Sequence, residues 1–320
     1  MRLHEDKDAF SELIEKTAEY IGLPQVYIEK DYWVTKSLKQ LSQSNYVEDV
    51  VFKGGTSLSK AYQLVERFSE DIDLAIFAAN KTDAARKKLL KSAEATVSAG
   101  LVAVIDDPRI SKGSTYRKTV YQYPRHVDGT QFGQASPELL IEVNAFTHPE
   151  PCELKSIETI IAQTLPSLNG TELISNFDLE SFQIKVLSVK RTLVEKMLGV
   201  IKDSYCDDPV AQLSKRIRHL YDICLILQQT ENAVFVESDE FLTLCKICID
   251  EESSGNFFSA KCFNNSLADA PLFNQFSDWH ERLLTTYNGV FADLVYGERP
   301  DIEEIANSLK FLQFHLQRLG

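Results

Sequence analysis

Strand signals are confined to the first part of this chain, and helix signals alone follow them. Before residue 150, short apolar runs such as VVF at 50–52 and ELLIEVNAF at 138–146 alternate with amphipathic segments. Short runs bounded by turn residues are typical of strands, whereas apolar residues that recur every three or four positions indicate helices. The sequence therefore predicts a mixed α/β part over residues 1–150 and an all-helical part over 151–320.

The expected elements are placed by their periodicity. In the first part we expect helices over 8–22, 25–42, 57–66 and 82–98. Expected strands there cover 50–52, 71–77, 101–107, 114–123 and 138–146, with a loop at Asp128-Gly129. In the second part we expect only helices, over 156–163, 181–203, 208–229, 238–249, 271–288 and 300–318.

The composition is that of an ordinary globular protein, with 44% hydrophobic and 25% charged residues. No apolar run approaches the ~18–20 residues that cross a bilayer, and the first residues lack the pattern of a secretory signal. Six cysteines are too few for a disulfide scaffold in 320 residues. We therefore expect a cytoplasmic protein with no membrane partner, and we interpret Cys245 and Cys248 as buried thiols rather than zinc ligands.

The chain is acidic, with a net charge of −13, but it carries two basic segments. The first runs from Arg109 to Arg125 without an acid, and the second runs from Lys185 to Arg218. An overall negative charge argues against a broadly basic nucleic-acid surface, although it says little about a local patch. The segments either hold an anionic ligand or are solvated faces that acids elsewhere balance, and the sequence leaves both interpretations open.

Three carboxylates are placed to act together. Asp71 and Asp73 lie two residues apart on an expected strand, so both side chains leave the same face. Glu142 lies in the middle of a second expected strand, where an acid is costly unless it is paired or ligates a metal. Carboxylate oxygens are the ligands that Mg²⁺ prefers, and Mn²⁺ accepts the same set. Asp71, Asp73 and Glu142 are therefore the candidate metal ligands.

A glycine pair precedes these acids and suits a phosphate. Gly54 and Gly55 follow the strand at 50–52, and glycine lets the backbone approach a ligand closely. Thr56 and Ser57 come next, at the start of an expected helix, where N–H groups and hydroxyls can donate to phosphate oxygens. Lys53 and Lys60 can add positive charge.

The segment FKGGTSLSKAYQLVERFSEDIDL at 52–74 resembles the nucleotidyltransferase superfamily of the DNA polymerase beta type, and more closely the AbiEii/AbiGii toxin family. The superfamily pattern is a Gly-Gly or Gly-Ser turn, a helix, and then Asp-x-Asp or Asp-x-Glu. The interval here is slightly longer than in the generic pattern, but Arg67-Phe68-Ser69 matches the lead-in of the toxin family.

Three further segments are similar to elements of the same family. They are IEKDYWVTKSL at 28–38, RTLVEK at 191–196 and RHLYDI at 218–223. The resemblance therefore spans about residues 28–225 and implies an α+β fold, with a polymerase-beta-like mixed sheet and flanking helices before an all-α domain. Departures are Glu at 142 in place of Asp and Ile at 223 in place of Leu.

The resemblance implies a role for each matching residue. The catalytic residues would be Asp71, Asp73, Glu142, Lys196 and Asp222. The substrate-binding residues would be Lys53, Gly54, Gly55, Thr56, Ser57, Lys60, Arg67, Ser69, Arg191 and Arg218. Lys196 would contact the triphosphate, and Asp222 would lie beside that lysine or beside the attacking group.

Several of these residues also have plain structural interpretations. Lys60 can serve a solvated helix face, and Arg67 can pair with Glu70 or Asp71. Asp222 can pair with Arg218 at the i, i+4 spacing of a helix. Glu142 and Lys196 can each belong to an ordinary salt bridge, and Asp71 and Asp73 can be solvated acids.

The implied activity is that of a Mg²⁺-dependent nucleotidyltransferase toxin. It would use an NTP, with GTP among the candidates, and transfer the nucleotide to an acceptor hydroxyl. The resemblance implies a tRNA or other RNA acceptor and a cognate antitoxin in a toxin–antitoxin or abortive infection system. A small-molecule or protein acceptor, or a nucleotide-binding module without turnover, are the alternatives.

Overall fold

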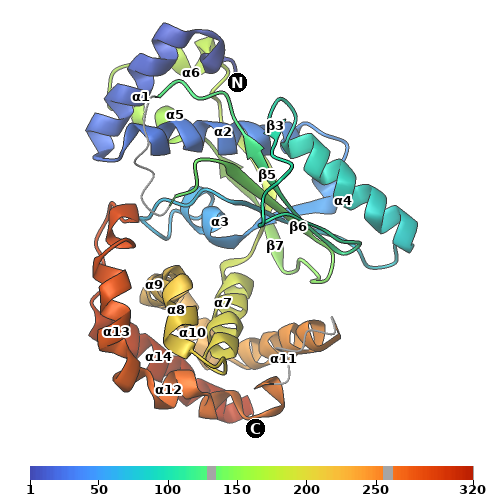
Figure 1. The fold of residues 1–320 in the computed structure, drawn as a ribbon, viewed down its shortest axis with the longest axis vertical. Coiled ribbons are helices and arrows are strands. Elements are labelled where there is room, and N and C mark those ends of the chain that lie inside the picture. Colours follow the sequence, from blue (N-terminus) through green and yellow to red (C-terminus); the bar gives the residue numbers. More distant parts are fainter. Residues whose placement is uncertain (128–134, 255–261, 320) are drawn as a thin grey trace. The chain divides into compact units, whose positions relative to one another are not determined.

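The computed structural model describes residues 1–127, 135–254 and 262–319, so the loop predicted at 128–129 lies outside it (Figure 1). The chain divides into two compact units. The first contains Met1–Gln63 and Phe68–Leu187, and the second contains Leu64–Arg67 and Ser188–Gly320. The sheet lies in the first unit, and the second is helical, which confirms the α+β class expected from the sequence.

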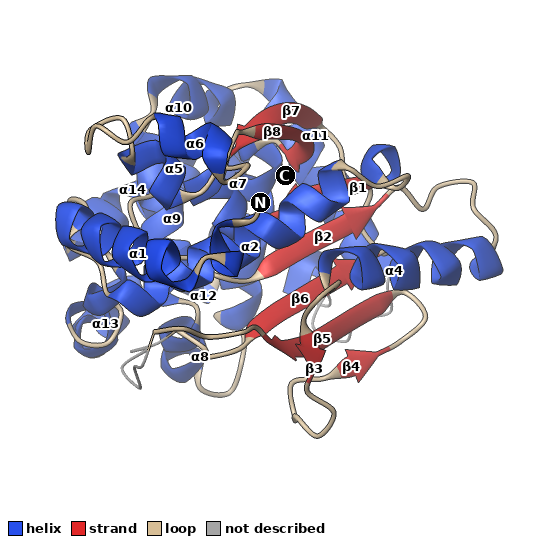
Figure 2. Cartoon of the chain, turned by 90° about the horizontal axis from the view of Figure 1, so that it is seen from above, coloured by secondary structure: helices blue, strands red, loops and turns tan. Residues whose placement is uncertain are grey.

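The described strands of the first unit form one mixed eight-stranded sheet in the order β3-β5-β6-β2-β1-β8-β7, with β4 beside β5 (Figure 2). Its strands are β1 (Val50–Lys53), β2 (Ile72–Ile76), β3 (Val102–Ala103), β4 (Ser111–Lys112), β5 (Tyr116–Gln122), β6 (Leu139–Asn144), β7 (Cys152–Ile157) and β8 (Phe182–Leu187). The pairs β1–β8 and β2–β6 are parallel, and the remaining pairs are antiparallel.

The centre of the sheet is buried because its strands are apolar on both faces. In β2, Ile72, Leu74 and Ile76 are fully buried, and Asp73 is the half-buried exception. In β6, Glu142 is the half-buried exception among buried residues. Both polar exceptions are therefore candidate ligands, and both lie on central strands.

Most of the described helices of the first unit pack on the sheet or on one another. The described helices are α1 (Lys7–Ile21), α2 (Gln25–Ser42), α3 (Gly54–Lys60), α4 (Asp83–Val97), α5 (Ile160–Thr164) and α6 (Glu172–Asn176). Figure 2 shows α2 and α4 lying over the strands. Local signals set the ends of α1 and the start of α4: Asp6 caps α1, Thr82 caps α4, and Gly22 ends α1 in the left-handed conformation.

Two helices expected after residue 150 are wrong in part. Ser156 and Ile157, expected to begin a helix over 156–163, are the last residues of strand β7, and Phe182–Leu187, expected within a helix over 181–203, is strand β8. Because β8 pairs with β1 and β7 pairs with β8, these residues belong to the sheet. The first compact unit therefore extends to Leu187, beyond the boundary placed at residue 150.

Smaller differences concern the ends of elements. Helix α3 spans Gly54–Lys60 and is shorter than the expected 57–66, and its first residues are the glycine pair itself. Strand β3 covers only Val102–Ala103 of the expected 101–107.

The described helices of the second unit are α7 (Val189–Asp203), α8 (Pro209–Lys215), α9 (Ile217–Gln228), α10 (Thr230–Glu237), α11 (Asp239–Ser254), α12 (Pro271–Asn274), α13 (Phe276–Asn288) and α14 (Ile302–Leu316). Ser188 caps α7 by accepting the Arg191 N–H, and Asp301 with Glu304 forms a capping box on α14. The short segment Leu64–Arg67 joins this unit through a bridge between Arg67 and Val295.

Candidate active site

Asp73 lies directly against the glycine pair. Strands β1 and β2 are antiparallel, and their register sets Lys53 opposite Asp73. Gly54 follows with φ +82°, and a Cβ atom built on it would fall 2.1 Å from Asp73 Oδ2. Only glycine allows both this backbone conformation and this close approach. The fold therefore places the predicted phosphate-binding turn in contact with a predicted metal ligand.

Glu142 is the parallel neighbour of Asp73. The register of β2 and β6 pairs Asp73 with Glu142, and Asp71 directly precedes β2, outside the expected strand that began at residue 71. All three are half-buried, so water and a ligand can reach them. The pairing of these two strands, which the sequence alone did not establish, sets Glu142 beside Asp73.

Two residues of β5 hold the Glu142 carboxylate. Lys118 is its cross-strand partner, with Nζ 2.5 Å from Glu142 Oε1, and the Tyr116 hydroxyl donates to Glu142 Oε2 at 2.8 Å. Burial raises the pKa of Tyr116, and the carboxylates of Glu142 and Asp73 raise it further. Tyr116 therefore stays protonated and donates. Tyr116 is not among the site residues predicted from the sequence. Its spacing of two from Lys118 on a strand places both side chains on the same face and could have identified it.

The acids fit a divalent cation in type and in register, but their side chains do not converge. Among the described residues, no three His, Cys, Asp or Glu side chains are gathered closely enough to hold an ion. Both oxygens of Glu142 instead bond to Lys118 and Tyr116. An ion at this place would need Glu142 to exchange its contact with Lys118 for the metal.

The hydroxyls after the glycine pair make internal hydrogen bonds. Thr56 Oγ1 and Ser69 Oγ are 2.9 Å apart, and Ser57 Oγ donates to the Gly54 carbonyl at 2.8 Å. Thr56 and Ser57 are buried, whereas the glycine pair is half-buried. The structure thus brings Ser69 to Thr56, the residue that follows the glycine pair. The contacts of these hydroxyls with phosphate stay a prediction.

Lys60 does not serve a solvated face. Its side chain is 6% exposed and forms an ion pair with Asp31 of α2. Asp31 also accepts the N–H of Ile160 at 2.8 Å. Lys60 therefore fastens α3 to α2, and the substrate contact expected for it stays a prediction.

Asp222 is the centre of a buried charge cluster in the second unit. Arg67 donates to both of its oxygens, with Nε–Oδ1 and Nη2–Oδ2 distances of 2.7 Å, and Lys196 Nζ lies 2.8 Å from Oδ2. Burial alone would raise the pKa of Asp222, but the two cations outweigh it and hold that pKa below its usual range. The structure confirms that Asp222 lies beside Lys196, and it gives Arg67 a partner 155 residues away.

Arg191 belongs to a second buried cluster. Its side chain is 1% exposed and pairs with Glu195 at 3.1 Å and with Glu251. The substrate contact expected for Arg191 stays a prediction. Arg218 is half-buried on α9, and its expected role is untested.

Acids elsewhere balance both basic segments. In the first segment, Arg109 pairs with Asp107 and Glu138, Arg117 pairs with Glu94, and Lys118 pairs with Glu142. In the second, six of the eight basic residues form ion pairs: Lys185, Lys190, Arg191, Lys196, Lys202 and Arg216. Of the two interpretations left open by the sequence, the structure favours charge balance over one anion-binding patch.

The chain from the glycine pair to Asp222 lies within the match of a known family. The family model described as nucleotidyl transferase AbiEii toxin, type IV toxin–antitoxin system, matches residues 36–250, which is two thirds of the chain. The chain belongs to this family. The AbiEii assignment confirms the resemblance seen in the motifs, and it makes the protein a nucleotidyltransferase.

A solved structure with a similar fold is MenT4, a nucleotidyltransferase toxin from Mycobacterium tuberculosis H37Rv. The match covers 93% of this chain and 98% of that chain, with a TM-score of 0.51 and 15% sequence identity. At this identity the likeness is one of fold. No curated protein matches the sequence.

Two further expectations can be compared with this AbiEii-family structure. Over the described residues, none of the helices has both the length and the apolar character that crossing a membrane requires. Cys245 and Cys248 are buried thiols, as expected, and burial raises the pKa of Cys245.

Proposed function

We propose that this AbiEii-family toxin transfers a nucleoside monophosphate from an NTP to an acceptor hydroxyl, with Mg²⁺ or Mn²⁺ held by Asp71, Asp73 and Glu142. The placement of Asp73 carries the proposal. Its carboxylate lies against Gly54 on one side, and its strand pairs it with Glu142 on the other. A phosphate at the glycine turn would therefore meet the carboxylates directly.

The residues of the chain have distinct parts in this reaction. The backbone of Gly54 and Gly55 admits the triphosphate, and Lys196, by family resemblance, neutralises its charge. A bound divalent ion supplies activation of the attacking hydroxyl and stabilises charge on the leaving oxygen. The acceptor oxygen forms a bond to the α-phosphorus, the bond to pyrophosphate breaks, and the hydroxyl proton passes to solvent or a nearby carboxylate.

The acceptor hydroxyl can belong to RNA, or to a protein or small molecule. An RNA acceptor, tRNA in particular, follows from the family resemblance. A protein or small-molecule hydroxyl is favoured by the ion pairs of the two basic segments, because paired lysines and arginines contribute little to the attraction of a phosphate backbone. We place RNA first because the motif resemblance implies an RNA acceptor.

The acceptor test uses each α-labelled NTP in turn, with Mg²⁺, the full chain and a cell lysate from which RNA, protein and small molecules are separated afterwards. Label in RNA supports the first proposal, and label in another fraction supports the second. Nucleotide binding with no label transferred to any fraction would contradict the transferase proposal.

We also propose a cognate antitoxin, because the matching family is one of type IV toxin–antitoxin systems. A cytoplasmic location stays a prediction. Co-expression of this chain with the product of a neighbouring gene should relieve growth inhibition if that product is the antitoxin.

Gly54→Ala is expected to lose about a hundredfold in transfer rate, as misplacement of a catalytic group by about 1 Å does. The new Cβ would overlap Asp73 Oδ2 and displace the carboxylate. Gly22→Ala is the matched control, because Gly22 has φ +79° but nothing within 4 Å of its would-be Cβ. Both variants should lose about 1 kcal/mol from backbone strain. Equal transfer rates in the two variants would contradict the proposed place of Asp73.

Lys118→Met is expected to bind Mn²⁺ about two- to fivefold more tightly than the wild type. The reason is that Lys118 competes for Glu142, and a partly exposed ion pair contributes about 0.5–1 kcal/mol. Titration followed by the electron paramagnetic resonance of free Mn²⁺ measures the affinity. Lys112→Met, which removes an exposed lysine on the neighbouring strand β4, controls for the change in net charge. Unchanged or weaker binding by Lys118→Met would show that Glu142 is not a ligand.

A further inference from the structure

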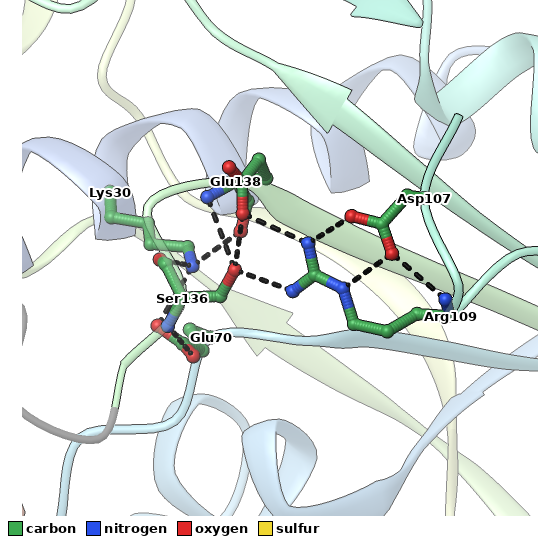
Figure 3. Close-up of polar contacts among 6 residues, drawn as sticks. All are labelled: Lys30, Glu70, Asp107, Arg109, Ser136 and Glu138. Carbon is green, nitrogen blue, oxygen red and sulfur yellow. Dashed lines mark hydrogen bonds and ion pairs between the residues drawn. The ribbon is translucent and has the colours of Figure 1, made fainter. Parts of the chain in front are cut away.

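Helix α2 carries a buried lysine whose ammonium group donates three hydrogen bonds. Lys30 is fully buried, and its Nζ lies 2.8 Å from Glu70 Oε2, 2.5 Å from the Ser136 carbonyl and 2.7 Å from the Glu138 carbonyl (Figure 3). A lysine ammonium has three donors, so each has one acceptor here. The side chain is therefore held in one position by three directional contacts.

The acceptors of Lys30 belong to the segments that lead into two particular strands. Glu70 directly precedes Asp71 and β2, whereas Ser136 and Glu138 directly precede β6, which carries Glu142. Glu70 Oε1 also accepts the Ser136 N–H at 2.7 Å. Lys30 and Glu70 thus join the two segments by contacts that are additional to the β2–β6 ladder.

A second cation holds the β6 side of this link. Arg109 donates to Ser136 Oγ at 2.9 Å and to Glu138 Oε2 at 3.0 Å, and it pairs with Asp107 (Figure 3). Ser136 Oγ also donates to Glu138 Oε2 at 2.7 Å. The segment before β6 is therefore held by Lys30 on its buried side and by Arg109 on its half-exposed side.

Stability alone does not account for a buried Lys30–Glu70 pair. Burial lowers the pKa of Lys30 and raises the pKa of Glu70, because the loss of water disfavours the charged form of each side chain. Well-packed apolar residues are often as stabilising as a buried ion pair or more so. An apolar pair makes no directional contacts, so it cannot fix the spacing of two backbone segments.

We propose that Lys30 is a positioning residue that sets the spacing between the carboxylates of β2 and Glu142 of β6. This inference rests on the proposed function, in which those carboxylates hold a divalent cation. Lys30 acts through Glu70 and through two backbone carbonyls.

The test is Mn²⁺ binding by the full-length Lys30→Met variant, measured by electron paramagnetic resonance of free Mn²⁺. We expect affinity to fall about tenfold or more, as it does when residues that orient metal ligands are removed. Lys39→Met is the matched control. Lys39 lies on the same helix and donates to the carbonyls of Asp178 and Glu180, which precede β8, a strand with no candidate ligand. Its Mn²⁺ affinity should equal that of the wild type.

Hydrogen exchange gives a readout that needs no metal. Amides of β2 and β6 should exchange faster in Lys30→Met, whereas Lys39→Met should leave them unchanged. Glu70→Gln keeps the size of the side chain and an acceptor for the Ser136 N–H, so it decides the question if Lys30→Met does not fold. It should shift Mn²⁺ affinity in the same direction by a smaller factor.

The outcomes separate this inference from the proposed function. If Asp73→Asn loses Mn²⁺ binding while Lys30→Met and Glu70→Gln bind like the wild type, the positioning role is wrong and the metal site stands. If the wild type binds Mn²⁺ no better than Asp73→Asn does, the metal site is wrong and the positioning role is wrong with it.

Discussion

Nucleotide transfer by an Asp73→Asn variant is expected to fall about a thousandfold. The substitution keeps the size of the side chain, so its packing against Gly54 is preserved. It removes the negative charge that would hold a divalent cation, whose charge stabilisation contributes several kcal/mol to such reactions. A loss of about 4 kcal/mol corresponds to roughly a thousandfold in rate.

The measurement is the initial rate of label transfer from an NTP to the acceptor fraction. Asp83→Asn is the control, because Asp83 is an exposed acid in the first turn of α4 and should leave the rate unchanged. A denaturant titration should show the same stability for both variants. Retention of more than a tenth of the wild-type rate by Asp73→Asn would remove Asp73 from the catalytic set.

Asp222→Ala is expected to destabilise the second unit by about 3–5 kcal/mol. Asp222 is fully buried, and it is the carboxylate that balances the buried cations of Arg67 and Lys196. Its removal leaves two like charges near each other in a site of low dielectric constant. The exposed pair of Asp239 with Arg318 is the control, and Asp239→Ala should cost less than about 1 kcal/mol.

Tryptophan fluorescence can follow this unit separately. The chain has two tryptophans, Trp33 in the first unit and Trp279 in the second, so a Trp33→Phe background leaves one probe in the second unit. The free energy of unfolding from a denaturant titration is then compared with and without Asp222→Ala. A loss of unfolding free energy below about 1 kcal/mol would show that the cluster contributes little to stability. Only the catalytic role expected for Asp222 would then remain.

Several charged residues of the motif segments in this chain lie in buried ion pairs. Lys30 and Asp31 of the IEKDYW segment, Arg67 before β2, and Asp222 of the RHLYDI segment all lie in buried ion pairs. These residues connect segments far apart in sequence. A motif residue in this chain can therefore serve the site by holding its parts, without touching a substrate.

Local pattern was sufficient for much of the site. The strand at Val50–Lys53, the glycine pair, the helix after it and the Asp-x-Asp strand follow from short-range periodicity and from the conformational freedom of glycine. The common face expected for Asp71 and Asp73 follows from the two-residue repeat of a strand. For β8, the alternation of Ile184 and Val186 with Gln183 and Lys185 was present in the sequence but was taken as part of a helix.

The sequence by itself determined the strand, glycine pair, helix and strand over residues 50–76, the candidate acids and the family, because periodicity, glycine and motif spacing are local properties of a chain. Only the tertiary structure decided that β2 pairs with β6, that Lys118 opposes Glu142, and that Arg67 meets Asp222. It also decided that β7 and β8 join the sheet. Strand pairing and buried ion pairs join residues distant in sequence, and the cost of burying a charge makes each such partner a property of the whole fold.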